Sequence, residues 1–86
     1  MKIHSSAKFK NSDFSFHNEF ELNLSLAQIG QNSTKIVNLA LSKFKEKCEE
    51  YFKVDFATMC FFEVYFFNGI DEILLFFKDP KTTKAE

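Results

Sequence analysis

Four side chains belong to the types that most often do chemistry in a small protein: Cys48, Cys60, His4 and His17. A cysteine nucleophile needs partial exposure and a base or a cation nearby. Both cysteines instead fall on faces that the apolar pattern of the chain predicts to be buried. We therefore expect two reduced thiols that pack in the core as small hydrophobic side chains.

The two histidines are expected to lie on the polar face of a strand and not in a metal centre. If the chain reverses direction at residues 10–13, His4 lies opposite Glu19 and His17 lies opposite Ser6. Imidazole and carboxylate groups are ligands that zinc accepts. Histidines on the polar face of a strand are usually solvated, however, so we expect no metal site.

Motifs for catalysis or cofactor binding are missing from the sequence. Its two glycines, Gly30 and Gly69, are too few for a phosphate-binding loop or a dinucleotide fingerprint. The serines do not stand in a nucleophile elbow, and the glutamates do not converge on a predicted cleft. We expect no catalytic residue, no cofactor and no enzymatic activity.

Length and composition predict one small globular domain. The chain has 86 residues, of which 45% are hydrophobic and 27% charged, as is ordinary for a protein with a single core. No apolar run reaches the ~20 residues of a membrane-spanning helix, and the first residues lack the apolar block of a secretion signal. The sequence therefore predicts a cytoplasmic protein without membrane contacts.

The charged residues argue against nucleic acid as a partner. The net charge is −1, and all 11 basic residues are lysines. Arginine supplies the planar fork that contacts phosphates and guanines with two hydrogen bonds, so its absence lowers the expectation of specific readout. Abundant Lys, Phe, Asn and Ile without Arg are also typical of an AT-rich genome, such as that of a low-GC bacterium, its phage or a plasmid.

The N-terminal third predicts two paired strands. Apart from Asn18, residues 13–26 alternate between apolar and polar side chains, whereas the apolar positions before them, Ile3, Ala7 and Phe9, have the opposite parity. A four-residue turn at 10–13 switches the parity and gives a hairpin. An alternative three-residue turn at 17–19 also preserves the pattern, and we favour the first.

Residues 30–53 predict an amphipathic helix. Gly30 ends the preceding strand, and Asn32 or Ser33 can cap the first amide groups. Apolar residues recur every three to four positions, which makes one buried stripe. The members of this stripe are Ile36, Val37, Ala40, Leu41, Phe44, Cys48, Tyr51 and Phe52. The opposite side is charged, and its acidic residues Glu46, Glu49 and Glu50 are a candidate second contact with a basic protein surface.

The remaining residues predict a second hairpin and a tail. Asn68-Gly69 is a strong signal for a two-residue turn, and residues 80–86 predict a flexible C-terminal tail. The chain is thus expected to form one α+β domain over residues 1–79: a four-stranded, mostly antiparallel sheet with one helix on one face, in the order β-β-α-β-β. Placing the first strand between the second and the third keeps every neighbouring pair antiparallel.

The C-terminal hairpin has large apolar side chains for both of its faces. With Asn68 and Gly69 as the turn, alternation puts one nearly apolar set under the helix, and a longer loop would keep the same division. The other set, apart from Met59, is the candidate partner-binding surface: Phe61, Glu63, Tyr65, Phe67, Ile70, Glu72, Leu74, Phe76 and Lys78. One helix covers one face, so this surface is expected to be open unless the N-terminal hairpin, the tail or curling of the sheet buries it.

These observations predict a non-catalytic protein-interaction module. A small cytoplasmic α+β protein from an AT-rich source, with no active site, suggests an inhibitor of host machinery from a phage or mobile element, such as an anti-CRISPR protein, which occludes a protein surface. No motif carries that finer hypothesis. The alternatives are single-stranded nucleic acid stacked on the aromatic face and a homodimer whose sheets stack through that face.

Overall fold

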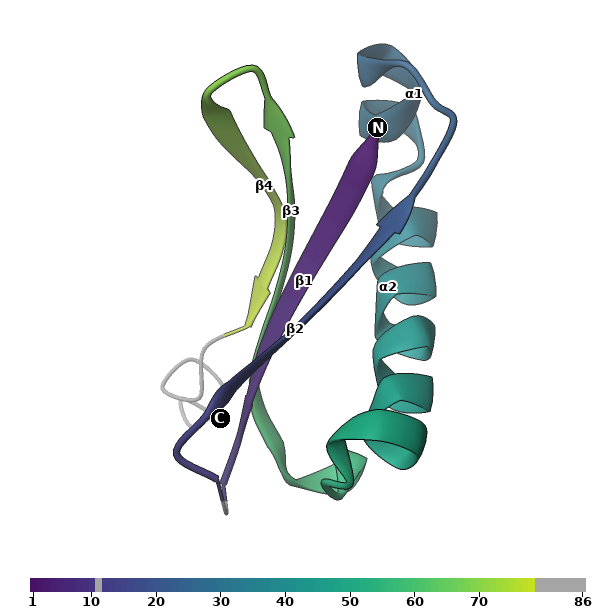
Figure 1. The fold of residues 1–86 in the computed structure, drawn as a ribbon. Coiled ribbons are helices and arrows are strands. Elements are labelled where there is room, and N and C mark those ends of the chain that lie inside the picture. Colours follow the sequence, from purple (N-terminus) through teal and green to yellow (C-terminus); the bar gives the residue numbers. More distant parts are fainter. Residues whose placement is uncertain (11, 79–86) are drawn as a thin grey trace, which may run out of the picture.

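The computed structural model describes residues 1–10 and 12–78, and these form a four-stranded sheet with one main helix on one side (Figure 1). The strands are β1 (Lys2–Phe9), β2 (Ser15–Glu21), β3 (Met59–Asn68) and β4 (Asp71–Lys78). All pairings are antiparallel, in the order β2-β1-β3-β4. The α+β class is therefore confirmed, and so is the position of β1 inside the sheet. The predicted tail at 80–86 lies outside the described residues.

Two helices follow β2: the short α1 (Leu26–Gln31) and the long α2 (Ser33–Lys47). A π-helical turn, Cys48–Phe52, continues α2, and a single turn of 3₁₀ helix, Phe56–Thr58, leads into β3. None of these helices has the length and hydrophobicity that crossing a membrane requires.

The N-terminal hairpin has the register that the parity switch predicted. His4 pairs with Glu19 and Ser6 pairs with His17, so the chain reverses before Ser15 and not at residues 17–19. β2 ends at Glu21, earlier than the alternation suggested.

The early end of β2 follows from a helix that the sequence analysis missed. Ser25 caps α1 through a capping box: the Gln28 amide donates to the Ser25 hydroxyl at 3.3 Å, and the Ser25 amide donates to the Gln28 side chain at 2.9 Å. Gly30 therefore lies inside a helix and does not end a strand. Asn32 stands at the start of α2, but its side chain donates to the Gln28 carbonyl and does not cap α2.

The core lies between α2 and the sheet face that we call the inner face. Ile36, Ala40, Phe44 and Cys48 from the helical side are buried there. They pack against buried residues of β1 and β3, namely Ile3, Ala7, Phe9, Phe62, Val64 and Phe66. Phe44 contacts the rings of Phe9, Phe52 and Phe62, with centroids 5.5–6.4 Å apart.

Tyr51 is a member of the predicted buried stripe that the structure places outside the core. It is 70% exposed, and the Lys47 ammonium lies 4.3 Å from its ring centroid. The π-helical turn after Lys47 explains the difference, because i to i+5 hydrogen bonding takes more residues per turn and shifts the following side chains off an α-helical stripe. Lys53, in the left-handed conformation at φ 56°, ends the turn.

The C-terminal hairpin turns one residue later than predicted. Asn68 pairs with Asp71, so Gly69 and Ile70 form the loop, and Gly69 takes a positive φ of 69°. Of the described residues in this loop only the glycine has positive φ, which fits a turn with glycine at its first central position. Tyr65 consequently faces Leu74 and Phe67 faces Glu72.

A β-bulge in β4 places Phe76 and Lys78 on the face opposite to the predicted one. The register shifts between the pairs Tyr65/Leu74 and Val64/Phe76, so Leu75 is an extra residue with no partner in β3. A bulge reverses the alternation beyond it. Phe76 and Lys78 therefore lie on the inner face, whereas Phe77, which was predicted to be buried under the helix, lies on the other face opposite Glu63.

Phe44→Ala is expected to lower the free energy of unfolding by ~3–5 kcal/mol, because it leaves a cavity at the centre of the aromatic core. Leu39→Ala, a matched change on the exposed side of the same helix, should cost less than ~1 kcal/mol. Urea unfolding followed by circular dichroism measures both changes. Equal losses in the two variants would contradict the position of Phe44 in the core.

Candidate functional site

The candidate site is the sheet face opposite α2, which we call the outer face. Six of the predicted partner-binding residues lie on it, and they come from β3 and β4: Phe61, Glu63, Tyr65, Phe67, Glu72 and Leu74. Ile70 lies in the turn at its edge and is 98% exposed. Phe77 joins the face, whereas Phe76 and Lys78 leave it because of the bulge.

Two aromatic clusters form on the outer face. In the first, His4 stacks on Tyr65 with centroids 5.3 Å apart and planes 11° from parallel, and Phe67 meets both rings edge-on at 5.3 and 5.7 Å. In the second, Phe61 and Phe77 meet edge-on at 5.4 Å. These are the geometries that aromatic pairs prefer. The neighbouring rings therefore support one another in fixed positions.

No described element of the chain covers these clusters. Phe67 is 45% exposed, Leu74 51% and Phe77 49%, while Phe61 and Tyr65 are half-buried by their neighbours on the sheet. The N-terminal hairpin does not fold over the face, because β1 and β2 are strands of the same sheet (Figure 1). The outer face of β3 and β4 thus presents grouped apolar area of the kind that marks interaction sites.

The half of the outer face on β1 and β2 is polar. Glu19 lies 3.5 Å from both the Lys2 ammonium and His4 Nδ1, and Ser6 Oγ shares a 2.8 Å hydrogen bond with His17 Nδ1. Ser6 is buried between its neighbours, so its hydroxyl is not open to a substrate. This Ser-His contact is therefore structural, since a nucleophile must be reachable.

An ion pair joins the N-terminal ammonium group to the glutamate at the end of β2. The Met1 ammonium lies 2.7 Å from the Glu21 carboxylate. The hydrogen bond from this ammonium and its positive charge lower the pKa of Glu21 below the usual range. The ion pair therefore favours the charged form of Glu21.

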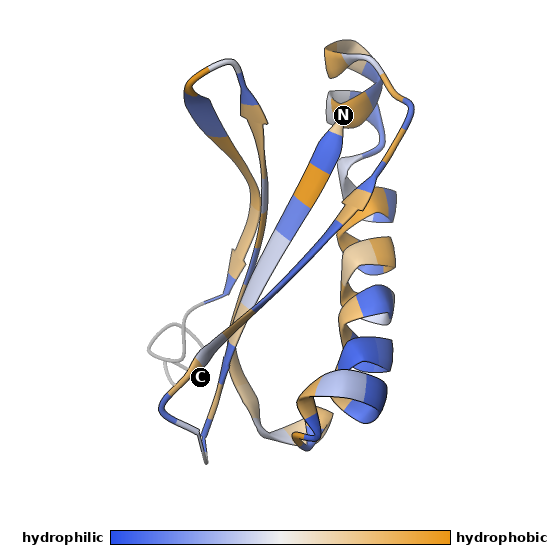
Figure 2. Cartoon of the chain, viewed as in Figure 1, coloured by the Kyte–Doolittle hydropathy of each residue, from blue (hydrophilic) through white to orange (hydrophobic). Residues whose placement is uncertain are grey.

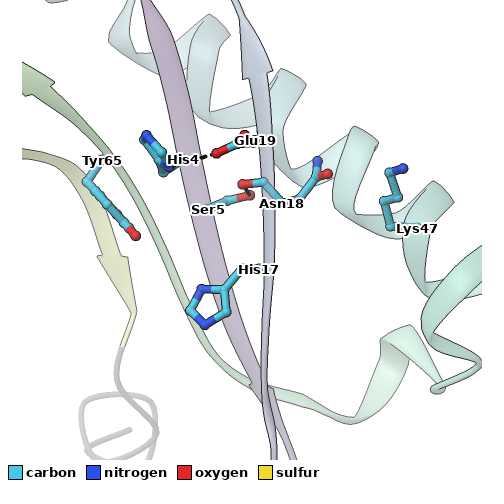
Figure 3. Close-up of a pocket in the computed structure, with 7 residues that line it drawn as sticks. All are labelled: His4, Ser5, His17, Asn18, Glu19, Lys47 and Tyr65. Carbon is cyan, nitrogen blue, oxygen red and sulfur yellow. Dashed lines mark hydrogen bonds and ion pairs between the residues drawn. The ribbon is translucent and has the colours of Figure 1, made fainter.

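A hollow of about 510 Å³ adjoins His4, His17, Glu19 and Tyr65, but it is not a converging site. Its remaining lining residues, Ser5, Asn18 and Lys47, come from the inner side of the sheet and from α2 (Figure 3). His17 lies apart from the His4–Glu19 pair in the same view. Within residues 1–10 and 12–78, no group of three His, Cys, Asp or Glu side chains is placed to hold a metal ion.

The predicted acidic contact is a separate surface. Glu46 lies on α2, and Glu49 and Glu50 lie on the π-helical turn after it. All three are exposed, but the helical layer is on the other side of the sheet from the outer face. One flat partner surface therefore cannot contact the acidic residues and the aromatic clusters together.

Cys60 differs from its predicted place in the core. The register between β1 and β3 shifts after the pair Lys8/Phe61, which leaves Cys60 as an extra residue beside Met59. Its thiol is 3.5 Å from the Lys8 carbonyl, and it lines a groove of about 420 Å³ between α2 and β4. Cys60 is half-buried, whereas Cys48 is fully buried as predicted.

Comparisons with known proteins give no relative for this chain. No protein-family model matches it, and no similar protein was found among curated sequences or solved structures. The functional argument therefore depends on the geometry described above.

The two thiols are expected to react at different rates in the native protein. Burial, with the nearby charge of Glu49, raises the pKa of the Cys48 thiol, so both access and thiolate formation are suppressed there. Titration with a disulfide reagent should detect Cys60 first and Cys48 only after denaturant is added. Cys60→Ser should remove the early reaction and Cys48→Ala should keep it. Rapid native reaction of both thiols would contradict the core position of Cys48.

Proposed function

We propose that this chain is a non-catalytic protein-binding module whose contact surface is the outer face of β3 and β4. One observation carries the proposal: two ordered aromatic clusters lie on a sheet face that no described part of the chain covers. Aromatic rings dominate the energetics of interfaces because they bury a large area at a low entropic cost.

The charges around the clusters supply a polar rim. Glu63 stands between Ser6 and Phe77 across the sheet, and Glu72 is exposed beside Phe67. Lys8 lies at the other end, with its ammonium 5.7 Å from the ring centroid of Phe61. An apolar centre with charged groups at its edge is the usual anatomy of a protein interface.

For the biological role we propose inhibition by occlusion. A chain of 86 residues that binds through one face can block a functional surface on a larger protein. An inhibitor of host machinery carried by a phage or a mobile element, of the anti-CRISPR type, acts in this way. The open aromatic face supports this proposal, and so does the residue composition, which is typical of a protein from an AT-rich genome.

Phe67→Glu is expected to leave the fold intact and to abolish partner binding. Phe67 is 45% exposed, so a carboxylate there reaches water in the free protein, but in a complex it would be buried without a partner. Loss of a central aromatic anchor typically costs ~2 kcal/mol or more of binding energy. Affinity capture from the source cell, followed by titration of the captured protein, measures the loss.

Tyr51→Glu is the matched control. Tyr51 is also an exposed aromatic residue, but it lies on the helical side, away from the outer face. This variant should bind as the unchanged protein does. If Phe67→Glu binds normally, or if circular dichroism shows that it unfolds because Phe67 belongs to the core, the proposed surface is wrong.

Single-stranded nucleic acid is the second candidate, because the stacked His4 and Tyr65 rings form a platform on which bases could stack. The same face also carries more acids than lysines. The acids are Glu19, Glu21, Glu63 and Glu72, and the lysines are Lys2 and Lys8.

We expect weak or no binding of short single strands at ~150 mM salt, since phosphates would be repelled by that excess of carboxylates. Fluorescence anisotropy with labelled oligonucleotides tests this expectation. Submicromolar binding that disappears in Tyr65→Ala would favour the nucleic-acid function over the protein-binding one.

A further inference from the structure

β4 is an unusually apolar strand for the edge of a sheet. Among the described strands it pairs with β3 alone, since their order is β2-β1-β3-β4. Five consecutive apolar residues, 73–77, occupy its centre, and charges stand only at its ends (Figure 2). Natural proteins usually protect an open edge with central charges, proline or a cover, because an apolar edge pairs readily with another strand.

The inner face beside β4 is also incompletely covered. Two adjoining hollows of about 420 and 260 Å³ lie between α2 and β4, and both are lined by Val37, Asn38 and Phe76. Leu75 lines the smaller one. The apolar inner side of β4 therefore has room for further side chains next to the edge itself.

We propose that the free edge of β4 pairs antiparallel with β4 of a second copy of this chain. Two-fold symmetry with the axis between Leu74 and Leu75 places Asp71 opposite Lys78, Glu72 opposite Phe77 and Ile73 opposite Phe76 of the second copy. The two copies then form one continuous eight-stranded sheet, and the apolar inner sides of both β4 strands adjoin between the two α2 helices.

Because of the β-bulge, the residues that this pairing places opposite each other lie on the same face of the sheet. Directly opposed residues of an antiparallel pair point to the same face. Asp71, Ile73, Phe76 and Lys78 all belong to the inner face, and Glu72 and Phe77 belong to the outer one. In each of the three opposed pairs, both residues therefore lie on the same face of the sheet. The ladder is interrupted only at the axis, where Leu74 points outward and Leu75 packs toward the core.

The end charges favour a second copy over other occupants. β4 has opposite charges at its two ends, Asp71 and Lys78. In an antiparallel pair with two-fold symmetry, Asp71 of each copy lies opposite Lys78 of the other, which gives two pairs of opposite charges. The segment that follows β4, residues 79–86, has only Pro80 and Ala85 as apolar residues. It is therefore a poor match for an apolar edge and groove.

Charge reversal tests the proposal directly. Analytical ultracentrifugation of the whole chain should show a dimer with a dissociation constant of ~10–100 μM, since edge pairing buries less area than a standard interface. Asp71→Lys and Lys78→Asp should each weaken dimerisation by about tenfold or more, because each creates two like-charge pairs. The double variant Asp71→Lys/Lys78→Asp should restore it.

Two controls separate this dimer from other associations. Lys10→Asp/Asp13→Lys swaps the charges of two exposed residues on the other hairpin and should leave the dimer unchanged. Phe67→Glu should also leave it unchanged, whereas Asp71→Lys should not affect partner binding through the outer face. The proposal is therefore independent of the proposed function.

Four results would overturn the proposal. These are a wild-type chain that stays monomeric at ~1 mM, a dimer that tolerates both single reversals, a folded double variant that does not dimerise, and a dimer that Phe67→Glu abolishes. The last would indicate sheets stacked through the outer face.

Discussion

The structure depends on one limit: a four-stranded sheet has two faces, and α2 is the only long helix in the described part of the chain. Burying Phe44, Ile36 and Ala40 against β1 and β3 fixes which face is the inner one. Side chains of opposite parity then lie on the outer face, where no described element covers them. The aromatic clusters of the outer face are a direct consequence, because β3 and β4 carry large apolar residues at both parities.

The sequence was sufficient for features that strict alternation determines. The parity switch between Phe9 and Phe14 predicted where the first hairpin turns and that His4 pairs with Glu19, and the register of β1 and β2 confirms both. The outward positions of Tyr65 and Phe67 followed from the same rule. Alternation is reliable there because a register slip of one residue would move the whole apolar set of a strand into water.

Features that break alternation could not be predicted in this way. Two bulges, at Cys60 and at Leu75, each add one residue to a strand, and a bulge has no residue type that identifies it. They account for the exposure of Cys60 and for the exchange of Phe76 with Phe77 on the outer face. α1 is a different case, because Ser25 and Gln28 form the S-x-x-Q signature of a capping box, which was present in the sequence but was overlooked.

The two halves of the outer face are unequal as binding surfaces. On β1 and β2, Ser6 and Glu19 already have hydrogen-bond or ion-pair partners within the chain, so a new partner would have to replace those contacts at little net gain. On β3 and β4, Phe67 and Phe77 are ordered by neighbouring rings but remain about half exposed. Their burial would remove apolar area from water without a large ordering cost, because the rings are held before contact. The free energy available for association is therefore concentrated on the β3 and β4 half, and the polar half is better suited to setting orientation.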